Sequence, residues 1–232
     1  MNKVTNRNFV SRALQFLVRQ PSMRLIKKHM RAKKPIVLDV GAGNKSVHRL
    51  QDAFPGAIYH GIDRIRDYNN SPKEIALIEK FFEMDLTDLR FLEISDNEYD
   101  LVNMSHVIEH LYNGDKVIKE LAAKVKPAGL IYIEFPGPKS LTLPSMKGCL
   151  NFFDDSTHCR IFSVPEVANI LLNENFQVVK CGVRRDFIRI SLMPIRICYH
   201  LLKYRTPLGS DLWDFLGFSE YVLGRKLPPK NL

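Results

Sequence analysis

Two glycines stand directly behind a short apolar run, and this arrangement is suited to holding a nucleotide-like cofactor. The run at residues 35–40 reads Pro-Ile-Val-Leu-Asp-Val and is followed by Gly41 and Gly43. Glycine lacks a Cβ atom, so a chain that turns sharply here can bring its backbone close to a ligand. Asp63 ends the next apolar run, at the separation of about 20 residues where an acidic side chain binds ribose hydroxyls. The pattern predicts a ribose-containing cofactor at the carboxyl ends of parallel strands.

Three histidines are the candidates for proton transfer: His106, His110 and His158. Histidine is the usual general base for a hydroxyl acceptor, because its pKa lies near neutrality. We expect His158 to be that base or an acceptor contact, with Asp154 or Asp155 orienting its ring. The alternative is a hydrogen bond that only ties down its loop. His110 is expected inside a helix, where a packing role is the better interpretation, and His106 is expected to touch the cofactor.

No metal site is expected. Asp154, Asp155 and His158 could be imagined as ligands, but two carboxylates adjacent in sequence are hard to aim at one ion. The four cysteines show no metal-ligand spacing. At this chain length they indicate buried thiols of a reducing compartment rather than a disulfide framework; they are Cys149, Cys159, Cys181 and Cys198.

Alternating strand and helix patterns must position these residues. Apolar runs bounded by turn residues predict strands, and several segments between them have helical spacing. The predicted strands cover residues 35–40, 57–63, 81–85, 99–104, 130–135, 176–183 and 218–226, and the predicted helices cover 46–54, 105–110, 114–125 and 164–173. This alternation predicts an α/β fold of Rossmann type, a doubly wound, mostly parallel seven-stranded sheet with helices on both faces.

Two segments lie outside this alternation. Residues 1–34 carry ten lysine and arginine residues and no acidic residue, and residues 8–31 predict two short amphipathic helices that meet at Pro21. Residues 187–217 form an apolar and basic insertion before the last strand, which we interpret as a lid or a membrane contact. The chain is therefore divided into a basic helical extension at 1–34 and one domain at 35–232.

The charge distribution narrows the choice of partners. The formal net charge is +9 although residues 35–183 are acidic on balance, so the positive charge is concentrated at the two ends. Basic ends suit an anionic membrane, nucleic acid or an acidic substrate, and a solvated basic helix is an equally good interpretation. No apolar run reaches the ~18 residues needed to span a bilayer, and Arg12 and Arg19 interrupt the N-terminal apolar clusters, which argues against a signal peptide. We expect a cytoplasmic protein, with peripheral membrane attachment as an option.

Several motifs resemble those of the class I S-adenosylmethionine (SAM)-dependent methyltransferases. Leu38-Asp39-x-Gly41-x-Gly43 resembles the first motif of that family. The resemblance continues through Gly61-Ile-Asp63, Met84-Asp85-Leu86, Ser-His-Val-Ile-Glu-His-Leu at 105–111 and Lys126-Pro-x-Gly129. The 105–111 stretch and residues 157–167 look like the small-molecule branch, which includes quinone-biosynthesis and sugar-modifying enzymes. The resemblance implies SAM as cofactor and a small-molecule acceptor, with a glycan or lipid-linked intermediate as candidates.

The resemblance assigns the methionine end of SAM to the first motif. Asp39 would act on the methionine moiety through water or through its amino group. The backbone of Gly41, Ala42 and Gly43 would cradle that moiety. At Lys45 the family often has a third glycine, so this sequence departs from the pattern in the loop that would hold the methionine moiety.

The resemblance assigns the nucleoside end of SAM to residues at the ends of the next two strands. Asp63 would hold the ribose hydroxyls, and Arg64 would flank the adenine. Asp85 would accept from the adenine amino group while Leu86 packs on the ring. The residues that would line the methionine end near the transferable methyl group are Met104, Ser105 and His106.

Three other functions are alternatives to a small-molecule methyltransferase. A nucleic-acid methyltransferase would suit the basic N-terminus, but the Asn/Asp-Pro-Pro-aromatic motif for methylating base amino groups is absent after residue 104 and no aromatic-interleaved basic stripe is present. A nicotinamide-dependent reductase would need a small residue such as glycine or alanine where Ser46 stands. A SAM-binding protein without catalysis is hinted at only by Lys45. We therefore favour a small-molecule methyltransferase.

Overall fold

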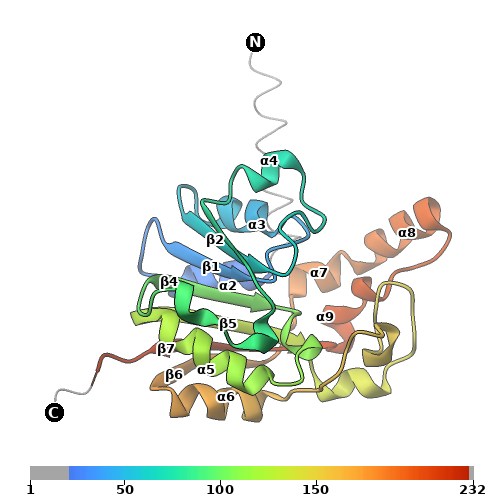
Figure 1. The fold of residues 1–232 in the computed structure, drawn as a ribbon. Coiled ribbons are helices and arrows are strands. Elements are labelled where there is room, and N and C mark those ends of the chain that lie inside the picture. The colour runs from blue at the N-terminus through green and yellow to red at the C-terminus, as the bar shows by residue number, and fades with distance from the viewer. Residues whose placement is uncertain (1–20, 230–232) are drawn as a thin grey trace.

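A seven-stranded sheet forms the centre of the computed structural model, which describes residues 21–229 (Figure 1). Its strands are β1 (Ile36–Val40), β2 (Ile58–Asp63), β3 (Lys80–Glu83), β4 (Tyr99–Ser105), β5 (Val125–Pro136), β6 (Phe176–Val183) and β7 (Ser219–Lys226). They lie in the order β3-β2-β1-β4-β5-β7-β6. Strand β7 is antiparallel to β5 and β6, and the other neighbours are parallel. The predicted Rossmann-like fold is confirmed, and the strand order reverses between β1 and β4, where ligands of such sheets bind.

Helices cover both faces of the sheet because successive strand residues point to opposite sides. On one face Leu38, Val102 and Ile131 pack in the core under α5 (Gly114–Lys124) and α6 (Val164–Asn173). On the other face their sequence neighbours Val37, Leu101 and Leu130 pack in the core with α2 (Pro21–His29) and α3 (Ser46–Ala53). This explains why the central strands are almost wholly apolar in sequence. A single short helix, α4 (Pro72–Ile75), lies between β2 and β3.

The basic extension is only partly within the described residues. The first of its two predicted helices lies outside them, and the second coincides with α2. Met23 and Ile26 of α2 are buried against the domain. The Arg225 guanidinium of β7 also donates to the carbonyl oxygen of His29 at 2.7 Å. The described part of the extension therefore packs as an integral helix.

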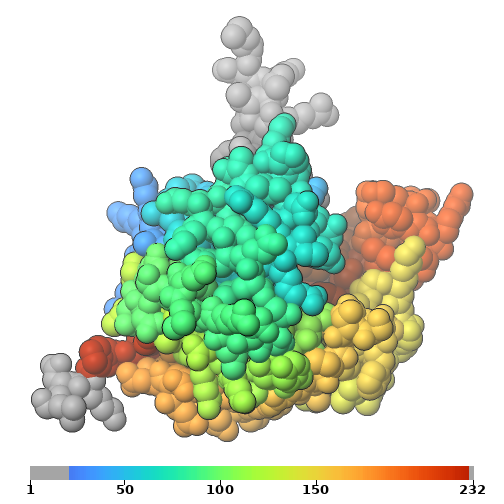
Figure 2. Space-filling model, in the orientation of Figure 1, coloured from blue at the N-terminus to red at the C-terminus, as the bar shows by residue number. Residues whose placement is uncertain are grey.

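The insertion before β7 consists of helices and lies beyond the carboxyl ends of β4 and β5. It contains α7 (Phe187–Ser191), α8 (Met193–Tyr204) and α9 (Trp213–Leu216), and α8 extends away from the body (Figure 1). Figure 2 shows the surface hollowed between the orange α8 and the blue-green part of the body. None of the helices within residues 21–229 is long and apolar enough to cross a membrane.

Two expectations are wrong. The predicted helix over 105–110 is a single 3₁₀ turn at Ile108–His110: β4 continues to Ser105, and His106 then takes a left-handed conformation with φ of 56° that interrupts a helical path. The cysteines are not all buried thiols either. Cys159, Cys181 and Cys198 are exposed, and Cys149 is half-buried.

Candidate functional site

The glycine turn after β1 is tied to the end of β2. Gly41 has φ of 77°, a conformation that glycine adopts at little cost. The backbone N–H groups of Gly41 and Ala42 both donate to the carbonyl oxygen of Ile62, at 2.8 and 3.0 Å. The turn therefore sits beside Asp63, the last residue of β2, as the sequence predicts for a cofactor cradle.

Protein groups approach this turn closely at both glycines. A Cβ atom on Gly41 would lie 2.5 Å from Cγ2 of Val107, and one on Gly43 would lie 2.7 Å from the Tyr68 ring. Larger residues could not be accommodated without movement of these neighbours. The contact with Val107 joins the glycine turn to the loop that follows β4.

Asp39 has a different environment from the one that its motif implies. The side chain is 1% exposed and accepts hydrogen bonds from the Tyr59 hydroxyl and the Asn103 amide, both at 2.6 Å. Burial raises the pKa of Asp39, and hydrogen bonds from Tyr59, Ser46 and Asn103 oppose that rise. Instead of an open carboxylate for the methionine moiety, the structure shows a sealed one that joins β1, β2 and β4 beneath the glycine turn.

Lys45 occupies the place of the third glycine by adopting a backbone conformation typical of glycine. Its φ is 61°, and that of Asn44 is 52°. The Lys45 N–H donates to Oδ1 of Asn70 at 3.0 Å, and the Asn44 N–H donates to the carbonyl oxygen of Tyr68 at 3.1 Å. The loop at 68–70 thus accepts hydrogen bonds from the N–H groups of the strained turn. The turn therefore forms although lysine occupies the place of the third glycine.

The predicted nucleoside residues meet at the ends of two neighbouring strands. Asp63 is half-buried, and one of its oxygens accepts from the Arg64 N–H at 2.7 Å. Asp85 accepts from the N–H and hydroxyl of Thr87 at 2.9 and 2.6 Å, and these bonds lower its pKa. The Arg64 guanidinium is 3.9 Å from the other oxygen of Asp85, and Leu86 beside it is buried. Two carboxylates beside a glycine turn fit the hydroxyl and amino donors of a nucleoside.

Two of the three residues predicted at the end of β4, Met104 and His106, have surroundings that differ from their predicted roles. Met104 is fully buried in the core, so its side chain cannot line a ligand site; Ser105 is half-buried at the strand end. The ring nitrogens of His106 face carboxylates, Nδ1 at 3.2 Å from Glu109 and Nε2 at 3.1 Å from Glu134. Burial alone would lower the pKa of His106, but the hydrogen bonds and charges of the two carboxylates raise it to about 9. His106 is therefore an imidazolium whose nitrogens are already used.

Sequence reasoning missed the charged network that continues from His106. Nη1 of Arg184 is 2.9 Å from Oε1 of Glu134, and its Nη2 is 3.2 Å from Oδ2 of Asp214. The Tyr132 hydroxyl donates to the second oxygen of Glu134 at 2.5 Å. These ion pairs connect β5 to the insertion. The one signal in the sequence is Glu134 itself, an acidic residue within the otherwise apolar run at 130–135.

Neither acidic residue orients His158 as predicted. Nδ1 of His158 donates to the carbonyl oxygen of Phe152 at 2.6 Å. Asp155 accepts from the N–H and the hydroxyl of Thr157 at 2.9 and 2.5 Å. Asp154 accepts from three backbone N–H groups, those of Met146, Leu150 and Asn151. Both carboxylates stabilise turns of their own segment, which is a common use of aspartate in loops.

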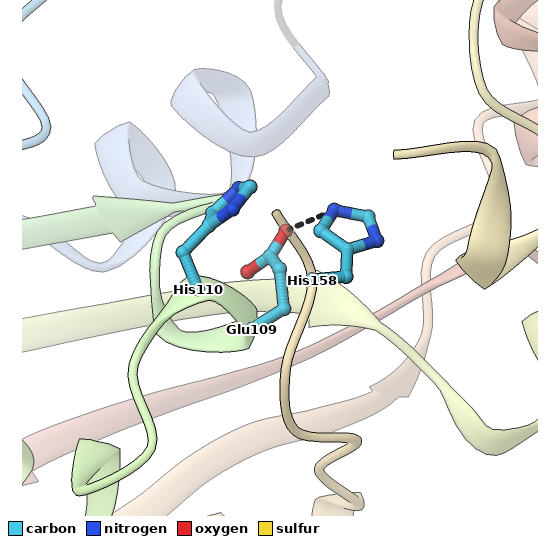
Figure 3. A group of neighbouring side chains, drawn as sticks. All are labelled: Glu109, His110 and His158. Carbon is cyan, nitrogen blue, oxygen red and sulfur yellow. Dashed lines mark ion pairs between the residues drawn. The ribbon is translucent and has the colours of Figure 1, made fainter. Parts of the chain in front are cut away.

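His158 instead meets His110 and Glu109. The two imidazole rings are 4.8 Å apart between centroids, and Nε2 of His158 is 4.0 Å from Oε1 of Glu109 (Figure 3). The N–H groups of Cys159 and Arg160 both donate to the carbonyl oxygen of Glu109, at 2.9 and 3.2 Å, and hold the two segments together. His110, predicted as a packing residue, is thus half-exposed at a cluster of polar groups.

Comparisons with known proteins identify the family of the chain. A family model described as a methyltransferase domain matches residues 7–181. A search of curated proteins finds no match.

Solved structures share the fold. A SAM-dependent methyltransferase from Archaeoglobus fulgidus is 21% identical, with a TM-score of 0.55 over 92% of this chain and 98% of that one. One from Mesorhizobium loti is 13% identical, with a TM-score of 0.59 over 89% and 96%. The 1,6-didemethyltoxoflavin-N1-methyltransferase of Burkholderia thailandensis, solved with 1,6-didemethyltoxoflavin and S-adenosylhomocysteine bound, is 16% identical, with a TM-score of 0.53 over 97% and 88%. At such identities the likeness establishes the fold.

Proposed function

Because the chain belongs to the methyltransferase domain family, the class I SAM-dependent methyltransferases, we propose that it methylates a hydroxyl group of a small-molecule acceptor. The observation that carries the acceptor chemistry is the pairing of His110 and His158, whose rings lie 4.8 Å apart. His110 lies in the loop behind β4, and the same loop contacts the glycine turn through Val107. Acceptor and cofactor would therefore meet at one edge of the sheet.

The cofactor residues fit the nucleoside of SAM. Asp63 and Asp85 present carboxylates at the ends of β2 and β3, beside the turn that contains Gly41 and Gly43. When bound, SAM supplies a sulfonium methyl group that is already strongly electrophilic, so the protein mainly has to align the acceptor and exclude water. Asp39 is a positioning residue, because it stabilises the strands beneath the glycine turn.

His158 is suited to take a proton from the acceptor. Its Nδ1 donates to the Phe152 carbonyl oxygen, so in the neutral ring Nε2 carries the lone pair. As the acceptor oxygen attacks the methyl carbon and the carbon–sulfur bond breaks, the hydroxyl proton would pass to Nε2 of His158. Asp155 contributes indirectly, by holding Thr157 next to the two histidines.

A lipid-linked acceptor is favoured by the outer surface of α8. Its inner side carries Arg196 and His200, which pair with Asp211 at 2.8 and 2.6 Å. Its outer side exposes Ile195, Tyr199 and Leu202 at 67%, 54% and 81%. These three recur at the spacing of one helix face. We therefore extend the proposal to a peripheral contact with an anionic membrane, made by the outer face of α8 and the basic ends of a cytoplasmic protein.

The first test is calorimetric titration with S-adenosylhomocysteine. Asp63→Ala should weaken binding by roughly 10- to 100-fold, because a hydrogen bond to a charged group is worth about 1.5–3 kcal/mol. Asp52→Ala, at an exposed position on α3, is the matched control and should bind like the wild type. Equal affinities for all three proteins would contradict the cofactor site, and heat with NADH in place of S-adenosylhomocysteine would indicate a dinucleotide enzyme.

A further inference from the structure

We propose that Glu109, His110 and His158 form a binding site for a divalent transition-metal ion such as Zn²⁺. One ligand atom from each residue lies within 4.8 Å of the other two, and the Glu109 carboxylate points into the space between the rings (Figure 3). Two imidazoles and one carboxylate are a ligand set of catalytic zinc, which leaves a position open for a water or substrate oxygen.

The hydrogen bonds of His158 leave the correct nitrogen for a metal. Its Nδ1 must be the protonated atom, because the partner at 2.6 Å is the carbonyl oxygen of Phe152, which can only accept. Nε2 of the neutral ring is then an unprotonated donor. Metal-binding histidines are usually oriented by such a bond from the other ring nitrogen to a carbonyl oxygen.

His110 is oriented in the same way through a hydroxyl and a carboxylate. The Thr157 hydroxyl lies 2.5 Å from Oδ1 of Asp155, an acceptor, and therefore donates its proton there. The same hydroxyl oxygen lies 2.8 Å from Nδ1 of His110 and must accept from it. In the neutral ring the lone pair of His110 is then on Nε2, as in His158. Both rings are thus fixed in the tautomer that a metal requires.

Glu109 supplies the negative charge. It is 1% exposed, and its Oε2 has no hydrogen-bond partner within the part of the chain that the structure describes. His106 contacts Oε1 only. A buried carboxylate oxygen without a partner is costly, and a bound cation would remove that cost.

The geometry requires only side-chain adjustment. Ligand atoms around a tetrahedral zinc at 2.0–2.1 Å are about 3.3 Å apart, which is closer than the 4.0 Å between Nε2 of His158 and Oε1 of Glu109. The segments that carry the ligands are already joined by the two backbone bonds to the Glu109 carbonyl oxygen. Rotations about side-chain bonds would bring the three atoms together.

The metal would refine the proposed function, on which this role rests. A hydroxyl oxygen in the open position would lose its proton to water more readily. That oxygen would then form its bond to the methyl carbon while the carbon–sulfur bond breaks and its electron pair stays on sulfur. His158 would then be a ligand instead of the general base, and the hydroxyl proton would pass to solvent water.

The test is binding of Zn²⁺ to the purified, untagged full chain after treatment with a chelator. We expect one equivalent by calorimetry, and one bound zinc by elemental mass spectrometry after gel filtration. His158→Ala and His110→Ala should each weaken binding by more than about 100-fold, since losing only the outer partners of a ligand costs 10–100-fold. Two control variants should bind like the wild type: Cys159→Ser removes the exposed thiol next to the cluster, and His48→Ala removes an exposed imidazole of α3.

Two results would overturn the metal site: absence of stoichiometric zinc binding to the wild type, or unchanged binding in both histidine variants. Retention of S-adenosylhomocysteine binding by His158→Ala shows that the variant is folded. Glu109→Gln keeps the shape of the side chain and tests the charge alone, with an expected loss of at least tenfold. The zinc measurement does not depend on SAM, so failure of the metal site and failure of the proposed methyl transfer are separate outcomes.

Discussion

The Glu134 carboxylate remains ionised although it is 1% exposed. Burial alone would raise its pKa, but the charge of Arg184, together with the hydrogen bond and charge of His106, lowers it to about 2. Tyr132 also donates to it. The carboxylate thus depends on Tyr132 of β5, Arg184 directly after β6 and His106 in the loop behind β4, and the insertion reaches the same network through Asp214.

This environment predicts a pH dependence of stability. A carboxylate whose pKa falls on folding contributes stability above its unfolded pKa of about 4.3 and loses that contribution as the pH falls toward its folded pKa. A shift of this size corresponds to about 3 kcal/mol. The difference in unfolding free energy between wild type and Glu134→Gln, measured in urea, should therefore shrink as the pH falls from 5 toward about 3. Glu93→Gln, at an exposed position, should show little difference at any pH; a constant gap for Glu134→Gln would argue against the ion pairs.

Residue types and spacing predicted the positions of the candidate site better than its contacts. Asp63 and the glycines follow strands directly, so a strand pattern suffices to place them together. The partner of Asp155 could not be predicted, because it depends on the turn that Thr157 makes. Glu134 meets His106 only after β5 has paired with β4.

At the scale of elements, the turn before α3 contains strain that glycine would remove. Asn44 and Lys45 both have positive φ. For residues other than glycine a left-handed conformation costs roughly 1–2 kcal/mol, somewhat less for asparagine. The hydrogen bonds to the 68–70 loop hold the turn in place and offset part of that cost.

Lys45→Gly should accordingly stabilise the protein. The relief of strain exceeds the roughly 0.4–1 kcal/mol by which glycine favours the unfolded chain, so we expect a gain of about 0.5 kcal/mol and a Tm higher by about 1–2 °C. Arg49→Gly, at an exposed position inside α3, should instead lower the free energy of unfolding by about 1 kcal/mol. Thermal unfolding followed by circular dichroism distinguishes the two. Destabilisation by Lys45→Gly would mean that the lysine side chain itself supports the turn.

The sequence located the insertion but not the partners of its basic residues. The segment from 187 to 210 contains basic residues and no acidic residue. The acidic partners come later in sequence, so Arg189 pairs with Asp214 and Arg196 with Asp211 on the inner side. The apolar face of α8 is consequently the outer one. Local periodicity gives two faces of a helix, and only the long-range ion pairs decide which of them is covered.

At the scale of the whole molecule, the reversal of strand order brings the separate parts of the site to one edge. β1 and β4 are neighbours although two strands separate them in sequence. The glycine turn and the loop 106–110 therefore leave the sheet side by side, in contact through Val107. The alternation of strands and helices predicted this sheet. The antiparallel β7, which returns the chain between β5 and β6, gives the insertion its place beyond the same edge.

The outward apolar face of α8 and the net charge of +9 together predict binding to anionic membranes. Burying one leucine side chain is worth about 1.5–3 kcal/mol, so Leu202→Asp should weaken co-sedimentation with vesicles of phosphatidylcholine and phosphatidylserine by roughly tenfold or more. Leu92→Asp is the matched control, because Leu92 is 99% exposed but lies outside this helix and should not contact the lipid. Binding should also decline when phosphatidylserine is omitted or the salt concentration is raised, since surface charges are then screened or removed. If Leu202→Asp and Leu92→Asp sediment equally well with the vesicles, α8 does not meet the membrane, and its exposed face is better explained as a lid over the hollow beside it.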